Sequence, residues 1–108
     1  GRQARRALKT ALSILDSNSD APEEIYTHIY KAVISFINHK TGSNRVEYST
    51  GEITEIIKNY DEAEVYKGIE QILKRGEAVR FAPISSQKAQ NDLLGIKQLL
   101  EKIDGNWS

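Results

Sequence analysis

The sequence has no cysteine, no methionine, only two prolines and no long apolar run. Without cysteine, the chain cannot form disulfides, use a catalytic thiolate or bind zinc through sulfur. No run of about 18 apolar residues is present, so these residues are not expected to span a membrane themselves. No signal-peptide pattern is visible either. The missing initiator methionine and the start at Gly1 indicate an excerpt of a longer protein.

The chain has fifteen basic and fifteen acidic residues, so its formal net charge is zero. Domains that bind nucleic acid through its phosphates usually carry a basic excess or a basic face. The one dense basic cluster lies at the start and consists of Arg2, Arg5, Arg6 and Lys9. General affinity for DNA or RNA is therefore not expected.

The composition is that of one folded domain, with 108 residues, 39% hydrophobic and 28% charged. Apolar residues recur at three- and four-residue spacing along most of the chain, which predicts an all-α fold. We expect a compact bundle of about five helices over residues 1–108, with the core bundle in 20–104. A short β element is the possible exception, at 43–48 or 78–81.

The first predicted helix lies within residues 1–18, where Arg2, Arg5 and Arg6 fall in the first turns. Positive charge is unfavourable there because the helix dipole is positive at that end. The conflict disappears if the helix continues from an upstream membrane-proximal segment, where cytoplasmic Lys and Arg are common. The alternative is a frayed start.

Capping patterns predict where the next helices begin and end. Asp20, with Glu23 three residues later, predicts a capping box at the start of the second helix, and Gly42 predicts its end. Two further capping boxes are expected, Ser49 with Glu52 for the third helix and Asp61 with Glu64 for the fourth. The fourth helix is expected to end at Gly76. A last helix is expected to begin at about Ser86 and to end at Gly105.

The sequence offers little for catalysis. His28 and His39 are eleven residues apart and do not form an H-x-x-H metal-binding pair. No glycine-rich phosphate loop and no convincing acid–base pair of carboxylates is present. We therefore expect no enzyme activity, no metal and no cofactor.

Two short helices at roughly 50–59 and 62–75, joined by a tight turn, resemble a helix-turn-helix or winged-helix core. This arrangement makes a nucleic-acid-binding module the alternative function. The second of these helices would display both signs of charge, and its acidic residues would repel phosphate. The charged residues on it are Glu62, Glu64, Lys67, Glu70, Lys74 and Arg75.

The segment Gly76–Pro83 is the most distinctive stretch of the chain. We expect Phe81 to pack into the core, since a large aromatic in a short link usually buries itself, and Arg80 to point outward toward Glu77. The alternative is that this segment forms an exposed contact surface for a partner protein. Tyr26 and Tyr30, four residues apart on one helix edge, are the other candidate anchors. The full set of candidate contacts is Arg80, Phe81, Pro83, Tyr26 and Tyr30.

Four runs of the sequence resemble the cytosolic tail of BatD proteins, bacterial membrane proteins of the Bat (aerotolerance) gene clusters. They are Glu24–Tyr26, Thr50–Ile53, Ile72–Leu73 and Arg80–Pro83. The resemblance implies a domain on the cytoplasmic side of the bacterial inner membrane, carried by a single-span protein. It also implies protein partners, namely MoxR-type AAA+ ATPases and BatA/BatB-like proteins with von Willebrand factor A domains. A non-catalytic docking or scaffold module is the implied function.

Overall fold

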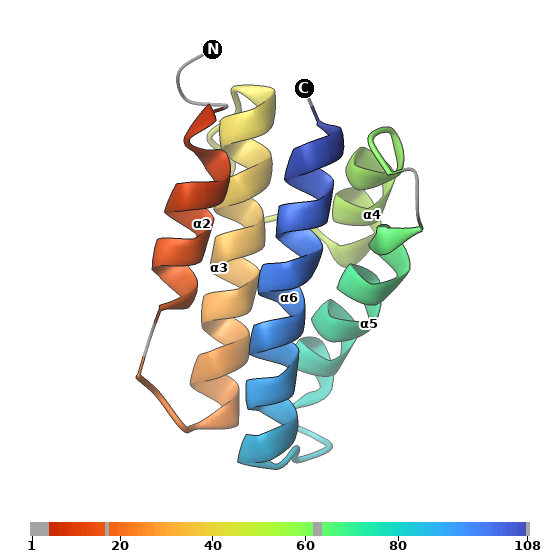
Figure 1. The fold of residues 1–108 in the computed structure, drawn as a ribbon. Helices are drawn as coiled ribbons and strands as arrows, with labels where there is room; N and C mark the ends of the chain where they lie inside the picture. Colours follow the sequence, from red (N-terminus) through yellow and green to blue (C-terminus); the bar gives the residue numbers. More distant parts are fainter. Residues whose placement is uncertain (1–4, 17, 62–63, 108) are drawn as a thin grey trace.

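A computed structural model describes residues 5–16, 18–61 and 64–107. The described residues form five helices and contain no strand, so the fold is an all-α bundle (Figure 1). The chain is compact, with a radius of gyration of 13.0 Å. The helices are α2 (Ala7–Leu15), α3 (Pro22–Thr41), α4 (Thr50–Lys58), α5 (Val65–Ala78) and α6 (Ser86–Asn106).

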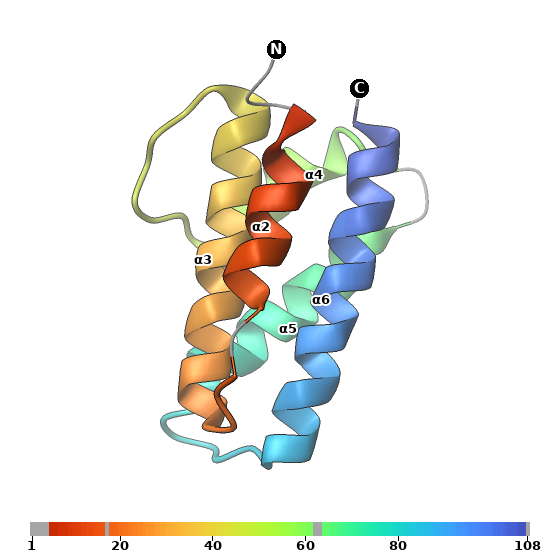
Figure 2. The ribbon, with the colours of Figure 1, turned by 60° about the vertical axis from the view of Figure 1, so that its left-hand side comes forward.

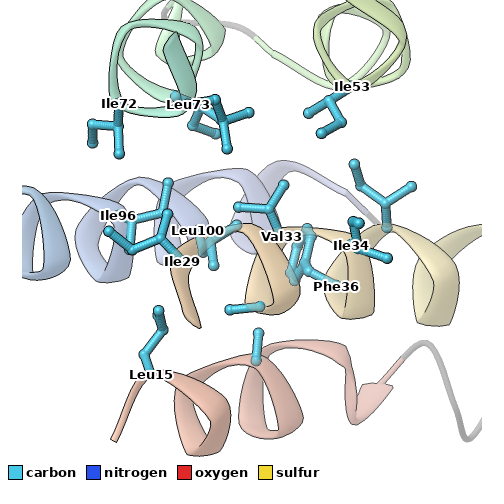
Figure 3. Packing of buried hydrophobic residues seen from close by; sticks show 14 of the residues in the cluster. Leu15, Ile29, Val33, Ile34, Phe36, Ile53, Ile72, Leu73, Ile96 and Leu100 are labelled. Atoms are coloured by element: carbon cyan, nitrogen blue, oxygen red, sulfur yellow. The ribbon is translucent and has the colours of Figure 1, made fainter. Parts of the chain in front are cut away.

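The helices are stacked in three layers. Figure 3 shows α3 and α6 in the middle, with α2 on one side and α4 and α5 on the other. Helix α5 packs against both α3 and α6, and α4 packs mainly on α5. Figure 2 shows α5 crossing behind the upright α3 and α6. The start of α2 and the end of α6 lie at the same end of the bundle (Figure 1).

The core is built mostly from aliphatic side chains of every helix, with Phe36 as its largest fully buried side chain. Phe36 of α3 is fully buried, as the apolar stripe of the second predicted helix requires. The other fully buried large side chains come from all five helices. They are Leu15, Ile29, Val33, Ile37, Ile53, Ile57, Ile69, Ile96, Leu100 and Ile103.

The chain end is part of this core. Trp107 is buried, its ring stacks on Tyr60 at 3.9 Å, and it meets Phe36 edge-on. Its carbonyl oxygen accepts a hydrogen bond from Lys40 Nζ, which also pairs with Asp104 at 2.7 Å. Helix α6 is thereby fixed to α3 and to the residues after α4. It ends at Asn106, one residue beyond the Gly105 expected from the sequence.

Two of the predicted helix boundaries are confirmed by the hydrogen bonds. Ser49 accepts from the Glu52 amide and Glu52 accepts from the Ser49 amide, which is the complete capping box predicted for α4. Gly42 ends α3 in the left-handed conformation at φ +71°, which glycine adopts without steric cost. The last helix starts at Ser86, as predicted.

The capping box predicted at Asp20 is wrong. The residue before α3 is Ala21, which makes no side-chain cap, and Pro22 is the first helical residue. The hydrogen bonds before the helix come from Ser19, whose hydroxyl accepts from the Ala21 amide and donates to the Glu24 carboxylate. Asp20 instead accepts hydrogen bonds from α6.

The boundaries predicted for the fourth helix are also wrong. Glu64 is itself the N-cap, with φ +54° and no side-chain cap, and α5 begins one residue later at Val65. Asp61 still caps the helix, because its carboxylate accepts from the amides of Val65 and Tyr66. At the other end α5 continues past Gly76.

Neither of the two possible β segments is a strand. Residues 43–49 form an irregular loop between α3 and α4, which stands away from the helices in Figure 2. Residues 79–82 form a turn, in which the amides of Phe81 and Ala82 donate to the carbonyl of Ala78. Among the described residues there is thus no wing beside α4 and α5.

Candidate docking groove between α3 and α5

A groove of about 330 Å³ runs between the first half of α3 and the second half of α5. Its floor is apolar and consists of buried side chains from both helices and from the residue that follows α5, namely Ile29, Ile72, Leu73 and Val79. Its rim is polar and largely exposed, and it includes Glu23, Thr27, Thr50, Glu77 and Arg80. An apolar floor under a polar rim is the usual arrangement of a protein or ligand contact site.

The α3–α4 loop closes one end of the groove and is held in place by hydrogen bonds to α3. The Tyr30 hydroxyl accepts from the Tyr48 amide at 3.0 Å and donates to the Tyr48 carbonyl at 2.8 Å. The Tyr48 hydroxyl donates to Asn38 Oδ1 at 2.6 Å, and Asn38 donates to the Arg45 carbonyl. This end of the groove is therefore fixed by the fold.

A second link joins α4 to the end of α5 at the groove rim. The Thr50 hydroxyl, in the first turn of α4, donates to Glu77 near the end of α5. Glu77 is consequently held by α4, and it forms no ion pair with Arg80. The prediction that Arg80 pairs with Glu77 is therefore wrong.

A buried polar network lies beside the groove floor and connects three helices. Asp92 of α6 accepts from the Tyr26 hydroxyl of α3 at 2.5 Å. It also accepts two hydrogen bonds of 2.7 Å from Arg75 of α5, in a bidentate pair. Each of α3, α5 and α6 supplies one member, so the network fixes the relative position of these three helices.

The surroundings shift two pKa values in opposite directions. Burial alone would raise the pKa of Asp92, but the hydrogen bonds from Arg75 and Tyr26 outweigh it and hold the pKa below its usual value. For Tyr26, burial and then the hydrogen bond to Asp92 raise the pKa well above that of an ordinary tyrosine. The network thus contains a carboxylate and a neutral phenol at neutral pH.

Sequence reasoning missed this network, although one signal was present. Asp92 lies three residues after Ala89 and four before Ile96, so it falls on the apolar stripe of the last helix. An acidic residue on a buried stripe must find a partner. Its partners Arg75 and Tyr26 are 17 and 66 positions away and could not be identified from spacing.

Gly76 has a role that differs from the one predicted. A Cβ at this position would lie 3.2 Å from Tyr26 Cβ and 3.3 Å from Tyr26 Cδ1. Glycine lets α5 approach the Tyr26 ring closely enough for the hydroxyl to reach Asp92. The residue therefore serves helix packing under the groove and not helix termination.

The structure brings three of the five predicted contact residues to the groove. Tyr26, Tyr30 and Arg80 line it, whereas Phe81 and Pro83 follow Arg80 on the exposed turn. Tyr26 is only 4% exposed, so it supports the groove from below and offers little surface to a partner. Tyr30 is half-buried.

The expected burial of Phe81 is wrong. Its side chain is 87% exposed, and Val79 is the residue of the turn that enters the core. The amides of Phe81 and Ala82 donate to the Ala78 carbonyl and fix the turn. In this turn Val79 points inward and Phe81 points outward. Phe81 directly follows Arg80 of the groove rim, and aromatic residues are enriched at protein interfaces.

The basic residues expected on the second helix of the helix-turn-helix pair all have acidic neighbours. Lys67 pairs with Glu64 at 3.0 Å and Lys74 lies 3.8 Å from Glu70. Arg75 is bound to Asp92 beside the groove. Glu62 lies outside the described residues. The helix therefore presents no unbalanced basic face over the part that the structure describes.

The two histidines lie apart from the groove lining. His28 is half-buried and its Nδ1 has no hydrogen-bond partner, while His39 Nδ1 lies 2.8 Å from the Ser35 carbonyl oxygen. Within residues 5–16, 18–61 and 64–107, no group of three or more His, Cys, Asp or Glu side chains could hold a metal ion. None of the described helices is long and apolar enough to cross a membrane.

Comparison with protein-family models, curated proteins and solved structures finds no match. What the domain does is therefore inferred from the groove, the exposed turn and the sequence resemblance.

Proposed function

We propose that this domain is a non-catalytic docking module that binds a protein partner through the α3–α5 groove and the turn Arg80–Pro83. We call these together the docking surface. The observation that carries the proposal is Phe81, which is 87% exposed and directly follows Arg80 of the groove rim. Interfaces concentrate their binding energy in such aromatic anchors, surrounded by polar residues that exclude water.

The resemblance to BatD tails supplies the proposed setting. In it the domain is the cytosolic part of a single-span protein of the bacterial inner membrane, acting in an oxygen-tolerance system. The proposed partners are a MoxR-type AAA+ ATPase or a BatA/BatB-like protein with a von Willebrand factor A domain. The run Arg80–Pro83, on which the resemblance partly rests, coincides with the exposed turn of the docking surface.

The charge pattern supports a protein partner over nucleic acid. A phosphate backbone requires several unpaired lysine or arginine side chains on one face. Lys67, Lys74 and Arg75 each have an acidic neighbour instead, and the net charge of the chain is zero.

An NMR titration of the isotope-labelled chain with the MoxR-type ATPase of the same gene cluster tests the proposal. Amide shifts are expected at the groove rim and on the turn, especially at Thr27, Arg80 and Phe81. Shifts confined to α2 and the outer face of α6 would place the contact elsewhere and contradict the proposed surface. No shifts with either the ATPase or the von Willebrand factor A proteins would contradict the proposed partners.

A further inference from the structure

A second hollow, of about 610 Å³, lies between the outer side of α3 and the loop that joins α3 to α4, which stands away from the helices in Figure 2. Two rows of α3 side chains and three loop residues line this loop hollow. They are Tyr30, Ile34 and Asn38, then Lys31, Ser35 and His39, and from the loop Ser43, Asn44 and Val46. Because a helix rises about 1.5 Å per residue, each row is about 12 Å long. An extended peptide segment of three or four residues has the same length.

The charge of the loop hollow has one sign. Lys31 is exposed and forms no ion pair with another described residue, and no described aspartate or glutamate lines the hollow. The side-chain amide of Asn44 adds a further donor. The docking surface differs, because its rim carries Glu23 and Glu77 as well as Arg80. The loop hollow therefore favours a carboxylate and disfavours a basic group.

The loop hollow also has an apolar part, formed by Ile34 and Val46. The loop on both sides of Val46 is fixed, since Asn38 donates to the Arg45 carbonyl at 2.8 Å and accepts from the Tyr48 hydroxyl at 2.6 Å. Val46 is nevertheless 88% exposed. An apolar side chain that packs against it removes this surface from water. An occupant with both a carboxylate and an apolar group thus fits better than a simple anion.

The backbone of the loop favours a peptide as this occupant. The amides of Asn44 and Val46 make no hydrogen bond with another described residue. Free main-chain groups of this kind pair with the backbone of a bound peptide. We propose that the loop hollow binds a short segment of a partner protein in which an acidic residue adjoins an apolar one. The carboxylate pairs with Lys31, and the apolar side chain packs between Ile34 and Val46.

An NMR titration of the isotope-labelled 108-residue chain with blocked tetrapeptides tests the inference. The acidic probe is acetyl-Ala-Asp-Leu-Ala-amide, and the neutral probe has Asn in place of Asp. The titration extends to about 20 mM, because so few contacts give only millimolar affinity. Amide shifts are expected at Lys31, Ser35, Asn44 and Val46. The acidic probe should bind about 3-fold more tightly than the neutral one, as expected for one exposed ion pair.

Variants test the two parts of the site separately. Lys31→Gln should remove the preference for the acidic probe, whereas Lys31→Arg should keep it. Lys102→Gln is the matched control, since Lys102 is an exposed lysine that does not line the loop hollow. Val46→Ser should weaken the binding of both probes about 5-fold, which corresponds to about 40 Å² of buried apolar surface. Phe81→Ser, at an equally exposed position outside the hollow, should change neither affinity. Circular dichroism shows whether each variant is folded.

Several results would overturn the inference. They are equal affinity of the wild type for the two probes, shifts confined to other parts of the chain, and no shifts at the highest concentration. Sodium phosphate at the same concentration is the control for a general anion site, and equal shifts of the same amides with it would also overturn the inference.

The loop hollow and the docking surface can be tested independently. Val46 does not line the α3–α5 groove, so Val46→Ser should leave binding of the ATPase to the docking surface unchanged. Phe81→Ser should weaken that binding and leave the peptide probes unaffected. Failure of the peptide titration therefore overturns this inference alone, and failure of ATPase binding overturns the proposed function alone.

Discussion

Replacing Asp92 by asparagine tests the buried network most sharply. The carboxylate is 5% exposed and accepts three hydrogen bonds, one from Tyr26 and two from Arg75. An asparagine amide has one accepting oxygen, so at least one donor from Tyr26 or Arg75 must face the NH₂ group. Each hydrogen bond to a charged group contributes about 1.5–3 kcal/mol, and a buried donor without a partner costs about 1–3 kcal/mol.

We expect Asp92→Asn to lower the free energy of unfolding by about 2–3 kcal/mol at pH 7, below the 3–5 kcal/mol of a fully buried pair. The lower value is expected because the Arg75 side chain is 31% exposed, so in the variant it can form hydrogen bonds to water in place of those to Asp92. The control is Glu55→Gln, which breaks the exposed pair with Lys58 and should change stability by less than about 0.5 kcal/mol. Urea denaturation followed by circular dichroism measures both.

The same variant has a predicted pH dependence. Because the native pKa of Asp92 is lowered, its ionised form stabilises the fold above the unfolded-state pKa of about 3.9. This stabilisation is lost as the pH falls through the native pKa, where Asp92 becomes neutral like asparagine. The difference between wild type and Asp92→Asn should therefore shrink below about pH 4. A loss of less than about 1 kcal/mol in the free energy of unfolding at pH 7 would refute the reasoning. So would a difference between the two proteins that stays constant from pH 7 to below pH 4.

Three further predictions concern the packing of the core and of the helices. Gly76→Ala should destabilise the fold, because its Cβ would crowd the anchored Tyr26 ring. Gly51→Ala, whose Cβ would only touch Ser49 Oγ at 3.9 Å, should gain up to about 1 kcal/mol, and urea denaturation of both variants checks this. In an ultraviolet titration one tyrosine should ionise later than the rest, and Tyr26→Phe should remove that component, because its raised pKa favours the neutral form as pH rises. Trp107→Ala should cost about 3–5 kcal/mol in thermal or urea unfolding, since its buried ring stacks on Tyr60; a loss under about 1 kcal/mol would contradict this.

The parts of the fold that depend on neighbours in the chain could be predicted from the sequence. The Ser49–Glu52 capping box and the left-handed Gly42 involve residues within one turn of each other, and both are confirmed. The apolar stripes predicted an all-α bundle of about five helices for the same reason. Asp61 does cap the fourth helix, as expected, but the helix starts later than predicted and the capped amides are those of Val65 and Tyr66.

The parts that depend on distant partners could not be predicted. Gly76 resembles a helix end until Tyr26, fifty positions earlier, is packed against it. Phe81 was expected in the core because of its size, but Val79 occupies the inward position of the turn. Trp107 lies beyond Gly105, where the last helix was expected to end, yet its ring contacts Phe36 of α3 and Tyr60. In each case tertiary contacts override a local preference.

The central claim is that the domain binds a protein partner through the groove and Phe81. Isothermal titration calorimetry of the MoxR-type ATPase with wild type, Phe81→Ser and Val46→Ser tests it most directly. Phe81→Ser should weaken binding at least about 10-fold, as expected for an aromatic anchor, while changing stability by less than about 0.5 kcal/mol. Val46→Ser should bind like the wild type. Equal affinity of Phe81→Ser and wild type would contradict the claim.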